Sequence, residues 1–335
     1  MITSNKKKKI SQENLILSLE FYRICLILLY NQFIYIILYY ILHITYYILH
    51  ITYYILHMIH LDNYIIQDKI SEGKFGAVYK GKHRYTGEPV AIKCELATAS
   101  SKTIKNEANI YLKLGNEPGF PTLKWYGKRQ NDNTLFLVID LLGPSLKTKI
   151  EEQGDKGDKG EEDKGLLHFT SIAKQMFRLC EILHGKGLVH RDIKPDNFLF
   201  SSSNNSLFLA DFGLCIYKER KMPKVLRKIK RTIGSPNYIS LNVHHLLEPG
   251  FRDDLESCVY VLLFLLNKGR QLWTNCDSIE DIQQRKEALL DALQHSDNPN
   301  ILVCYHLLNY FRQLDFQDSA DFNHIYYIIN NSSTK

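Results

Sequence analysis

One octapeptide, His190–Asn197 with the sequence HRDIKPDN, constrains the fold of this 335-residue chain more than any other feature. It places a carboxylate (Asp192), an ammonium group (Lys194) and a carboxamide (Asn197) at fixed offsets in one short loop. Phosphoryl transfer needs these groups: the carboxylate orients a hydroxyl, the cation meets the migrating phosphoryl group, and the amide oxygen holds a metal ion. Such a loop also requires a scaffold that brings a nucleotide and a second metal ligand to it.

A glycine-rich turn between two predicted strands indicates a nucleotide site ahead of this loop. The strand expected over Asn63–Ile70 leads into Ser71–Val78, SEGKFGAV, in which Gly73 and Gly76 lack a Cβ and let backbone amides approach phosphate oxygens. We therefore predict that Ile70, Gly73 and Gly76 contact the nucleotide.

A lysine at the end of the next predicted strand strengthens this interpretation. The strand Val90–Lys93, VAIK, is followed by an amphipathic helical stretch, Lys102–Leu114, that contains Glu107. A lysine that binds the α- and β-phosphates needs a carboxylate to fix its direction, and Glu107 is the candidate. The alternative is a strand-edge charge at Lys93 and a solvated helix residue at Glu107.

A buried-type strand, Leu135–Asp140, ends shortly before Gly143-Pro144, a pair that breaks regular structure. We predict a hinge here, with backbone groups at Asp140 and Leu142 reading the edge of a nucleobase and Ile139 at the back of the pocket. Apolar contacts would sandwich the ring. They would come from Val78, Ala91 and Leu199.

A second metal ligand is expected after the octapeptide. Two short predicted strands, Phe198–Phe200 and Leu207–Ala210, lead to Asp211-Phe212-Gly213. Mg²⁺ takes few protein ligands and keeps substrate phosphates and waters in its coordination shell. We predict that Asp211 and Asn197 supply those ligands.

The stretch Lys218–Arg231 is strongly basic, with Glu219 as its single acidic residue. It follows the predicted metal ligand, where a peptide substrate would dock, and would attract acidic or phosphorylated substrates. A solvated charged face is the alternative. The predicted substrate-binding residues are Lys218, Lys221, Lys224, Lys230 and Arg231.

Together these segments resemble the eukaryotic protein kinases, and their finer features resemble the casein kinase 1 family. Lys194, two residues after Asp192, is typical of serine/threonine kinases rather than tyrosine kinases. The finer features are LLGPSL at Leu141–Leu146, SLN at Ser240–Asn242 and RDDLES at Arg252–Ser257. The resemblance covers roughly residues 61 to 329.

The resemblance implies an α+β, bilobal fold: a small β-rich N-lobe over 61–142, a larger, mainly helical C-lobe over 143–330 and a short tail over 331–335. It also implies ATP and Mg²⁺ as cofactors and transfer of the γ-phosphoryl group to Ser or Thr. Asp192 would orient the acceptor hydroxyl and Lys194 would contact the γ-phosphate. Asp254 would anchor the catalytic loop. A spine between the lobes would consist of Tyr111, His190 and Phe212.

Two positions depart from the family pattern. Ser71 replaces the first glycine of the glycine-rich loop, which we expect to stiffen it and lower nucleotide affinity. Asn237 replaces an arginine thought to bind a substrate phosphate, so recognition of phosphate-primed substrates there is open. These departures motivate the alternative of a nucleotide-binding pseudokinase or scaffold.

The N-terminal extension, residues 1–60, has an unusual composition. No Asp, Glu, Lys or Arg occurs between residues 24 and 61, and ILHITYY at 41–47 recurs at 48–54. A membrane span, a hairpin or interfacial anchor, and an artefact of the gene model with Met58 as the true initiator all fit this pattern. A membrane-tethered adaptor is a further alternative that rests on this segment alone.

Bulk composition narrows the class of protein without identifying it. The net charge of +6 favours neither nucleic acid nor membrane binding, and the seven scattered cysteines contain no CxxC pair. We expect a cytoplasmic protein, with the nucleus as a further location, that acts as a monomer on protein substrates without binding nucleic acid. Residues 151–165, rich in Asp-Lys-Gly, should form a solvated low-complexity loop, and a long helix is expected over Leu166–His184.

Overall fold

The computed structural model describes residues 40–46, 61–73, 76–95, 103–129, 134–154, 168–202, 204–218 and 227–331. The chain divides into two compact units, Met1–Ile59 and His60–Lys335. In the first unit, residues 40–46 are helical. Among the described residues, no helix is both long and apolar enough to cross a membrane. Most of the predicted anchor segment 24–61 lies outside the described residues.

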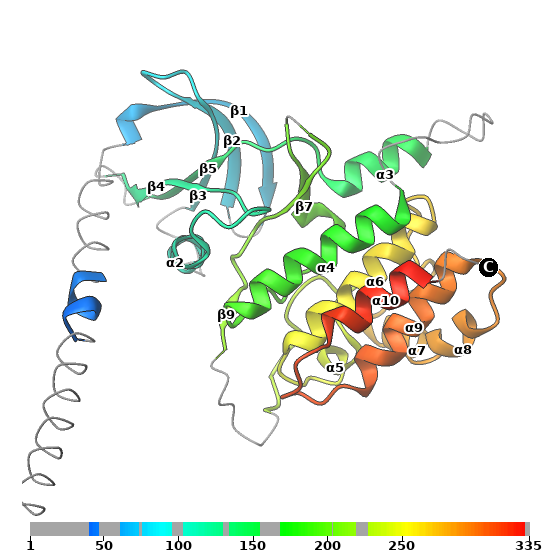
Figure 1. Cartoon of the computed structure of the whole chain (residues 1–335). Helices are drawn as coiled ribbons and strands as arrows, with labels where there is room; N and C mark the ends of the chain where they lie inside the picture. The colour runs from blue at the N-terminus through cyan, green and yellow to red at the C-terminus, as the bar shows by residue number, and fades with distance from the viewer. Residues whose placement is uncertain are drawn as a thin grey trace, which may run out of the picture. The chain divides into compact units, whose positions relative to one another are not determined.

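The second unit begins with a five-stranded antiparallel sheet that forms its N-lobe (Figure 1). The sheet has the order β1-β2-β3-β5-β4, and one helix, α2, packs against it. The elements are a 3₁₀ turn at Leu61–Asn63, β1 (Tyr64–Gly73), β2 (Gly76–His83), β3 (Pro89–Glu95), α2 (Ile104–Leu114), β4 (Leu123–Lys128) and β5 (Leu135–Asp140). β1 therefore runs three residues further than the predicted strand, into the glycine-rich turn.

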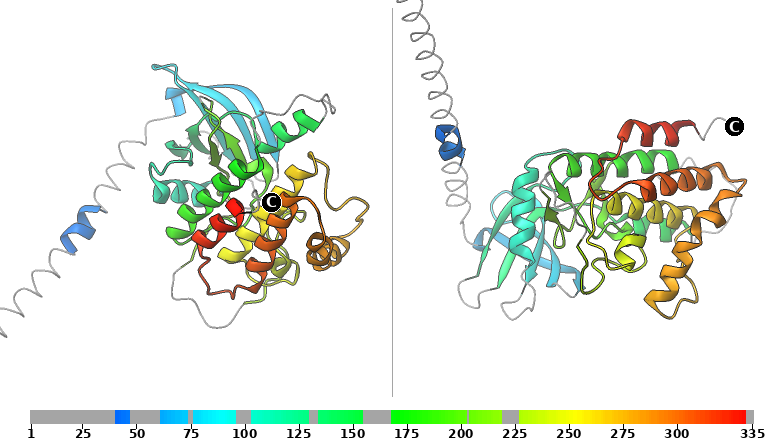
Figure 2. Two further views of the ribbon diagram at one scale, coloured as in Figure 1. Left: turned by 45° about the vertical axis from the view of Figure 1, so that its right-hand side comes forward. Right: turned by 90° about the horizontal axis from the view of Figure 1, so that it is seen from below.

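The C-lobe is mainly helical and also contains two short two-stranded sheets (Figure 2). Its helices are α3 (Leu146–Gly154), α4 (Phe169–Gly185), α5 (Leu241–His244), α6 (Phe251–Leu266), α7 (Ile279–Glu287), α8 (Leu289–Gln294), α9 (Pro299–Gln313) and α10 (Phe322–Asn331). Its short strands are β6 (Leu188–Val189), β7 (Phe198–Phe200), β8 (Leu207–Leu209) and β9 (Ile216–Tyr217), with a 3₁₀ turn at Pro195–Asn197.

Helix α6 is the centre of the C-lobe because it is buried, and its residues after Ser257 are apolar or aromatic on every side. Every residue from Asp253 to Phe264 is buried, and the helix packs against α4 and α9. A helix that is hydrophobic all round must be covered on all faces. The polar first turn of α6 is consequently held inside the protein, where its carboxylates bind backbone amides of neighbouring loops.

The hinge between the lobes follows β5. Gly143 N–H donates to Phe200 O at 2.8 Å, and Phe200 N–H donates to Pro144 O at 3.0 Å, so the chain leaving the sheet is tied to β7. This connection places the β3–β5 face of the sheet next to the β7–β8 hairpin. The nucleotide half and the octapeptide, which are about a hundred residues apart in sequence, meet at this junction.

Candidate active site

Three charged side chains from three elements meet between the lobes. Lys93 of β3 lies with its Nζ 2.7 Å from Glu107 Oε2 of α2 and 2.7 Å from Asp211 Oδ1 after β8. Burial alone would lower the pKa of Lys93, but the two carboxylates raise it well above its ordinary value. Burial would likewise raise the pKa of Asp211, yet the Lys93 ammonium holds it below its usual range. Both groups are therefore charged at neutral pH.

A further carboxylate, that of Glu95, fixes the position of the helix that carries Glu107. Glu95 is buried at the end of β3, and its Oε2 accepts hydrogen bonds from Thr103 N (2.9 Å), Thr103 Oγ1 (3.0 Å) and Ile104 N (3.0 Å). The Thr103 side chain makes no capping bond to its own helix, so Glu95 performs the capping from outside. A negative charge also interacts favourably with the positive end of a helix. Nothing in the local sequence signals this contact.

The octapeptide forms a loop in which Asp192 is the central acceptor. Its Oδ2 accepts from Lys194 Nζ at 2.8 Å, and its Oδ1 accepts from Ser235 N at 2.9 Å and Ser235 Oγ at 2.8 Å. Asn197 Nδ2 donates to the backbone oxygen of Asp192 at 2.8 Å. The pKa of Lys194 is raised because Asp192 outweighs the effect of burial. The sequence pattern predicted roles for Asp192, Lys194 and Asn197 but gave no signal for Ser235.

The backbone of this loop is held from below by α6. Asp254 Oδ2 accepts from His190 N at 2.8 Å, and Asp254 Oδ1 accepts from Arg191 N at 2.9 Å. Arg191 has a positive φ of 67°, a conformation that costs free energy for a residue other than glycine and persists only when neighbours impose it. The predicted anchoring of the loop by Asp254 agrees with this geometry.

Aromatic rings connect the two halves of the site. The Phe212 ring is fully buried, 5.0 Å from the Tyr111 ring of α2 and 5.3 Å from the His190 ring, measured between centroids. The predicted stack of Tyr111, His190 and Phe212 is therefore present. Asp211 itself has a φ of 64°, so its backbone is fixed in an uncommon conformation that presents its carboxylate to Lys93.

The donor set fits a magnesium ion. Mg²⁺ prefers oxygen ligands and is bound through one or two protein side chains plus phosphates and water. Asp211 offers a carboxylate oxygen that stays ionised, and Asn197 uses its Nδ2 as a donor to the loop, so its remaining polar atom is an oxygen. These two residues would hold the ion next to the phosphates that Lys93 binds.

The residues predicted to contact the nucleobase are spread over the sheet, the hinge and β7. β3 and β5 pair Ala91 with Ile139, β2 and β3 pair Val78 with Lys93, and Leu199 forms a bridge to Ser145. Asp140, which pairs with Val90 of β3, donates its N–H to Thr122 O at 3.3 Å. The other predicted contacts at this site are Leu142, Ile70, Gly73 and Gly76.

Glycine is required at one of these positions. Gly76 has a φ of 133°, and a Cβ there would lie 2.0 Å from the backbone oxygen of Cys94 on β3. Ile70 on β1 is 54% exposed.

A basic groove adjoins Asp192. A cavity of about 820 Å³ is lined by Arg191, Asp192 and Lys194 from the octapeptide loop, by Leu214, and by the chain from Lys228 to Ser235. Lys230 and Arg231, two of the predicted substrate-binding residues, line this cavity and are exposed. Lys221 and Lys224 lie outside the described residues.

The prediction that Lys218 contacts substrate is wrong. Lys218 is buried, its Nζ donates to Pro249 O at 3.2 Å, and it lies 3.3 Å from the centroid of the Phe316 ring. Burial lowers its pKa to about 8. Lys218 therefore joins β9 to the segment before α6, and the basic run begins to face solvent only further along the chain.

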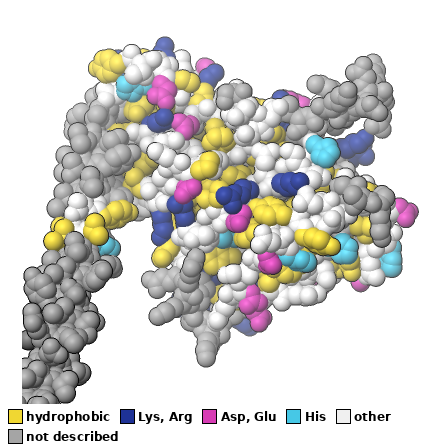
Figure 3. All heavy atoms as spheres, viewed as in Figure 1, with side chains coloured by type: hydrophobic (Ala, Val, Ile, Leu, Met, Phe, Trp, Pro, Cys, Tyr) yellow, Lys and Arg dark blue, Asp and Glu magenta, His cyan; other side chains and the backbone are white. Residues whose placement is uncertain are grey.

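On the face that α4 and α10 turn to the viewer in Figure 3, basic and acidic side chains lie next to one another. On α4, Arg178 and Glu181 form an ion pair at 2.7 Å.

These features define a phosphotransferase site: a paired lysine and carboxylates for a nucleotide, and an oriented acid for an acceptor. A comparison with protein families agrees, because the sequence model of the protein kinase domain matches residues 64–310. The chain therefore belongs to the protein kinase family, and the predicted bilobal kinase fold is confirmed.

Proposed function

We propose that this protein is a serine/threonine kinase of casein kinase 1 type that phosphorylates acidic or already phosphorylated protein substrates, using ATP and Mg²⁺. The observation that carries the proposal is the arrangement around Asp192, whose two oxygens accept from Lys194 on one side and Ser235 on the other. Bound Mg²⁺ would neutralise charge on the phosphates. The intact Lys93–Glu107 and Lys93–Asp211 pairs favour an active enzyme over a pseudokinase.

In the proposed reaction the chain acts mainly by positioning and electrostatics. The acceptor hydroxyl oxygen bonds to the γ-phosphorus of ATP while the bond from that phosphorus to the leaving ADP oxygen breaks. The hydroxyl proton passes to Asp192, which Ser235 and Asn197 hold in place. Lys194 stays protonated beside Asp192 and stabilises charge on the transferred group.

The basic groove supports the substrate preference. Arg191, Lys228, Lys230 and Arg231 line the groove, and among the described residues of its lining Asp192 is the single acidic one. An acidic or phosphorylated residue beside the acceptor would meet these cations, and a basic residue would be repelled. We further propose that the protein works as a monomer in the cytoplasm or nucleus, where ATP is available and the free cysteines of the described residues stay reduced.

Incubation of the full chain with Mg-ATP and casein tests the activity. We expect phosphate on Ser and Thr residues, and none with Asp192→Asn or Lys93→Met at matched concentration. No incorporation by the wild type above that of Asp192→Asn would refute the proposal.

Synthetic peptides test the preference. Serine peptides flanked by Asp should be phosphorylated with a higher kcat/KM than peptides flanked by Ala or Arg. The double variant Lys230→Glu, Arg231→Glu should remove that difference, whereas Lys268→Glu, at an exposed lysine after α6, should keep it. An unchanged preference in the double variant would contradict the assignment of the groove.

A further inference from the structure

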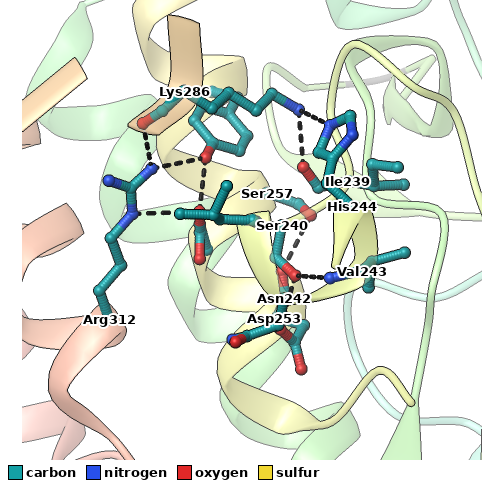
Figure 4. Close-up of polar contacts among 12 residues, drawn as sticks. Ile239, Ser240, Asn242, Val243, His244, Asp253, Ser257, Lys286 and Arg312 are labelled. Carbon is teal, nitrogen blue, oxygen red and sulfur yellow. Dashed lines mark hydrogen bonds and ion pairs between the residues drawn. The ribbon is translucent and has the colours of Figure 1, made fainter. Parts of the chain in front are cut away.

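A fully buried lysine, Lys286, lies beneath the chain segment that follows the basic groove (Figure 4). It is on α7, and its Nζ contacts the backbone oxygens of Pro236 at 3.0 Å and Ile239 at 2.7 Å. The same segment begins with Ser235, which donates twice to Asp192 Oδ1. Lys286 is therefore connected to the acceptor site through a few residues of backbone, which we call the 235–241 segment.

The groups around the Lys286 amine can accommodate it both as a cation and as a neutral amine. His244 Nε2 lies 3.1 Å from Nζ, and the centroids of the Tyr260 and Trp273 rings lie 4.4 Å and 5.4 Å away. Aromatic faces attract a cation, and this attraction is stronger where water is excluded. As an ammonium group, Lys286 can donate to both carbonyls and to His244. As a neutral amine, it can still donate to both carbonyls and accept from His244, so its contacts persist in either state.

A second, partly buried cation holds the far end of the segment. Arg312 of α9 donates from Nε to Glu256 Oε1 at 3.3 Å, and the same oxygen accepts from Leu241 N at 3.1 Å. Arg312 Nη2 also donates to the backbone oxygen of Lys286 at 2.7 Å. Figure 4 shows the Arg312 guanidinium next to the backbone of Lys286, whose side chain extends from there toward Ile239 and His244. The 235–241 segment is thus attached at its middle by Lys286 and at its end through Glu256.

The upper side of this segment is accessible. A pocket of about 420 Å³ is lined by Lys147, Lys194, Asp196, the chain from Ser235 to Tyr238, and Gln271. Trp273 Nε1 donates to the Asn237 oxygen at 2.9 Å from below. A polypeptide that presents its hydroxyl to Asp192 passes Lys194 and Ser235, so it must lie against backbone whose position these buried donors determine.

Resting on the function proposed above, we infer that Lys286 is a positioning residue for the acceptor polypeptide. It fixes the 235–241 segment through the Pro236 and Ile239 carbonyls and is not among the predicted nucleotide contacts, which lie on β1, β2, β3, β5, β7 and the hinge. Burying a lysine costs free energy unless it is well hydrogen-bonded. A methionine of similar length would fill the same space without that cost, so the amine is needed for what it binds.

Steady-state kinetics of the full chain with an acidic serine peptide test this inference. For Lys286→Met we expect the peptide KM to rise about tenfold, which corresponds to about 1.4 kcal/mol. The ATP KM and the slow hydrolysis of ATP without peptide should stay within about twofold, since an interaction used only for peptide binding leaves them unchanged. Lys286→Arg, which keeps several donors, should recover most of the peptide KM. Arg285→Met, at the exposed neighbour on α7, is the matched control and should behave as the wild type.

A structural role alone would give a different pattern. In that case Lys286→Met would lower the fraction of active enzyme, and with it kcat, at an unchanged peptide KM, and this result would overturn the inference. Should Lys286→Met fail to fold, Lys286→Gln replaces it: its side chain is one bond shorter than that of lysine, so its amide is not expected to reach both carbonyls, and a raised peptide KM is again expected. An unchanged peptide KM in that variant would equally overturn it.

Hydrogen exchange separates this inference from the proposed function. If the wild type phosphorylates no peptide, the proposed function fails, yet the amides of Tyr238, Ile239 and Leu241 still report the order of the segment. We expect these amides to exchange at least tenfold faster in Lys286→Met, while those of α2 keep their wild-type rates. Equal exchange in both proteins would refute the attachment by Lys286.

Discussion

Glu95 offers the sharpest test of how this site is assembled, because it controls α2 without touching a substrate. Its Oε2 caps the helix through three hydrogen bonds of 2.9 to 3.0 Å in a buried setting. Replacement by alanine leaves two backbone N–H groups and a hydroxyl without this acceptor. A hydrogen bond to a charged group is worth about 1.5–3 kcal/mol and a lost cap about 0.5–2 kcal/mol. One oxygen serves all three donors, so the contributions do not add, and about 3 kcal/mol is a reasonable total.

That free energy acts on the position of Glu107, one turn after the cap. When α2 shifts, Glu107 leaves Lys93, and the lysine loses the partner that directs it. If the whole of about 3 kcal/mol appears in the transition state, kcat/KM for ATP falls by about a hundredfold. Glu95→Gln, which keeps an acceptor oxygen without the charge, should fall between the wild type and Glu95→Ala.

The assay measures kcat/KM for ATP at saturating peptide, together with the thermal midpoint. Glu88→Ala is the matched control, because Glu88 is an exposed glutamate just before β3 whose partner, Lys124, is also held by Asp140. It should change kcat/KM by less than about twofold, as exposed ion pairs contribute little. The reasoning would be refuted if Glu95→Ala matched this control in both kcat/KM and thermal midpoint.

Three further predictions concern α6, the acceptor site and pH. Asp254→Asn keeps one oxygen acceptor for the two loop amides. Because hydrogen bonds to charged groups are strong, we expect it to lower kcat about 10- to 100-fold with little change in the ATP KM. An unchanged kcat would show that Arg191 keeps its conformation without the carboxylate. Ser235→Ala removes one of the two Ser235 donors to Asp192 and should lower kcat about fivefold, whereas Ser235→Thr keeps the hydroxyl and should preserve kcat. Equal rates for Ser235→Ala and the wild type in rapid-quench measurements would contradict this. Burial lowers the pKa of Lys286 from 10.5 to about 7. Between these values the unfolded state binds more protons, so the wild type gains stability as pH rises, by up to about 1.4 kcal/mol per pH unit relative to Lys286→Met, which lacks this titration. Denaturant unfolding of the wild type and of Lys286→Met at pH 6 and pH 9 measures this gain. The prediction would be contradicted if the free energy of unfolding of the wild type, minus that of Lys286→Met, were smaller at pH 9 than at pH 6. The groups that face the amine are Glu256, Tyr260, His244 and Arg312.

The reactive groups could be predicted because their spacing is local. In the octapeptide, Asp192, Lys194 and Asn197 are within six residues, and their relative placement follows from one turn of backbone. Asp211 and Phe212 are adjacent in the sequence, so their relative placement is local as well. The pairing of Lys93 with Glu107 was predictable because a strand and the helix after it leave few arrangements. The helical spacing of apolar residues also predicted the long helix over Leu166–His184, and the structure has α4 at Phe169–Gly185.

The sequence by itself thus determined the chemistry of this protein and the order of its elements. Only the tertiary structure decided which charged groups face solvent and which hold the backbone. Lys218 belongs to a basic run yet is buried on Phe316, and Glu95, Ser235 and Lys286 bind partners in other elements. The physical reason is that the free energy of a buried charge depends on desolvation and on the donors and acceptors that surround it. Folding brings those groups together from distant parts of the chain, and no local pattern records them.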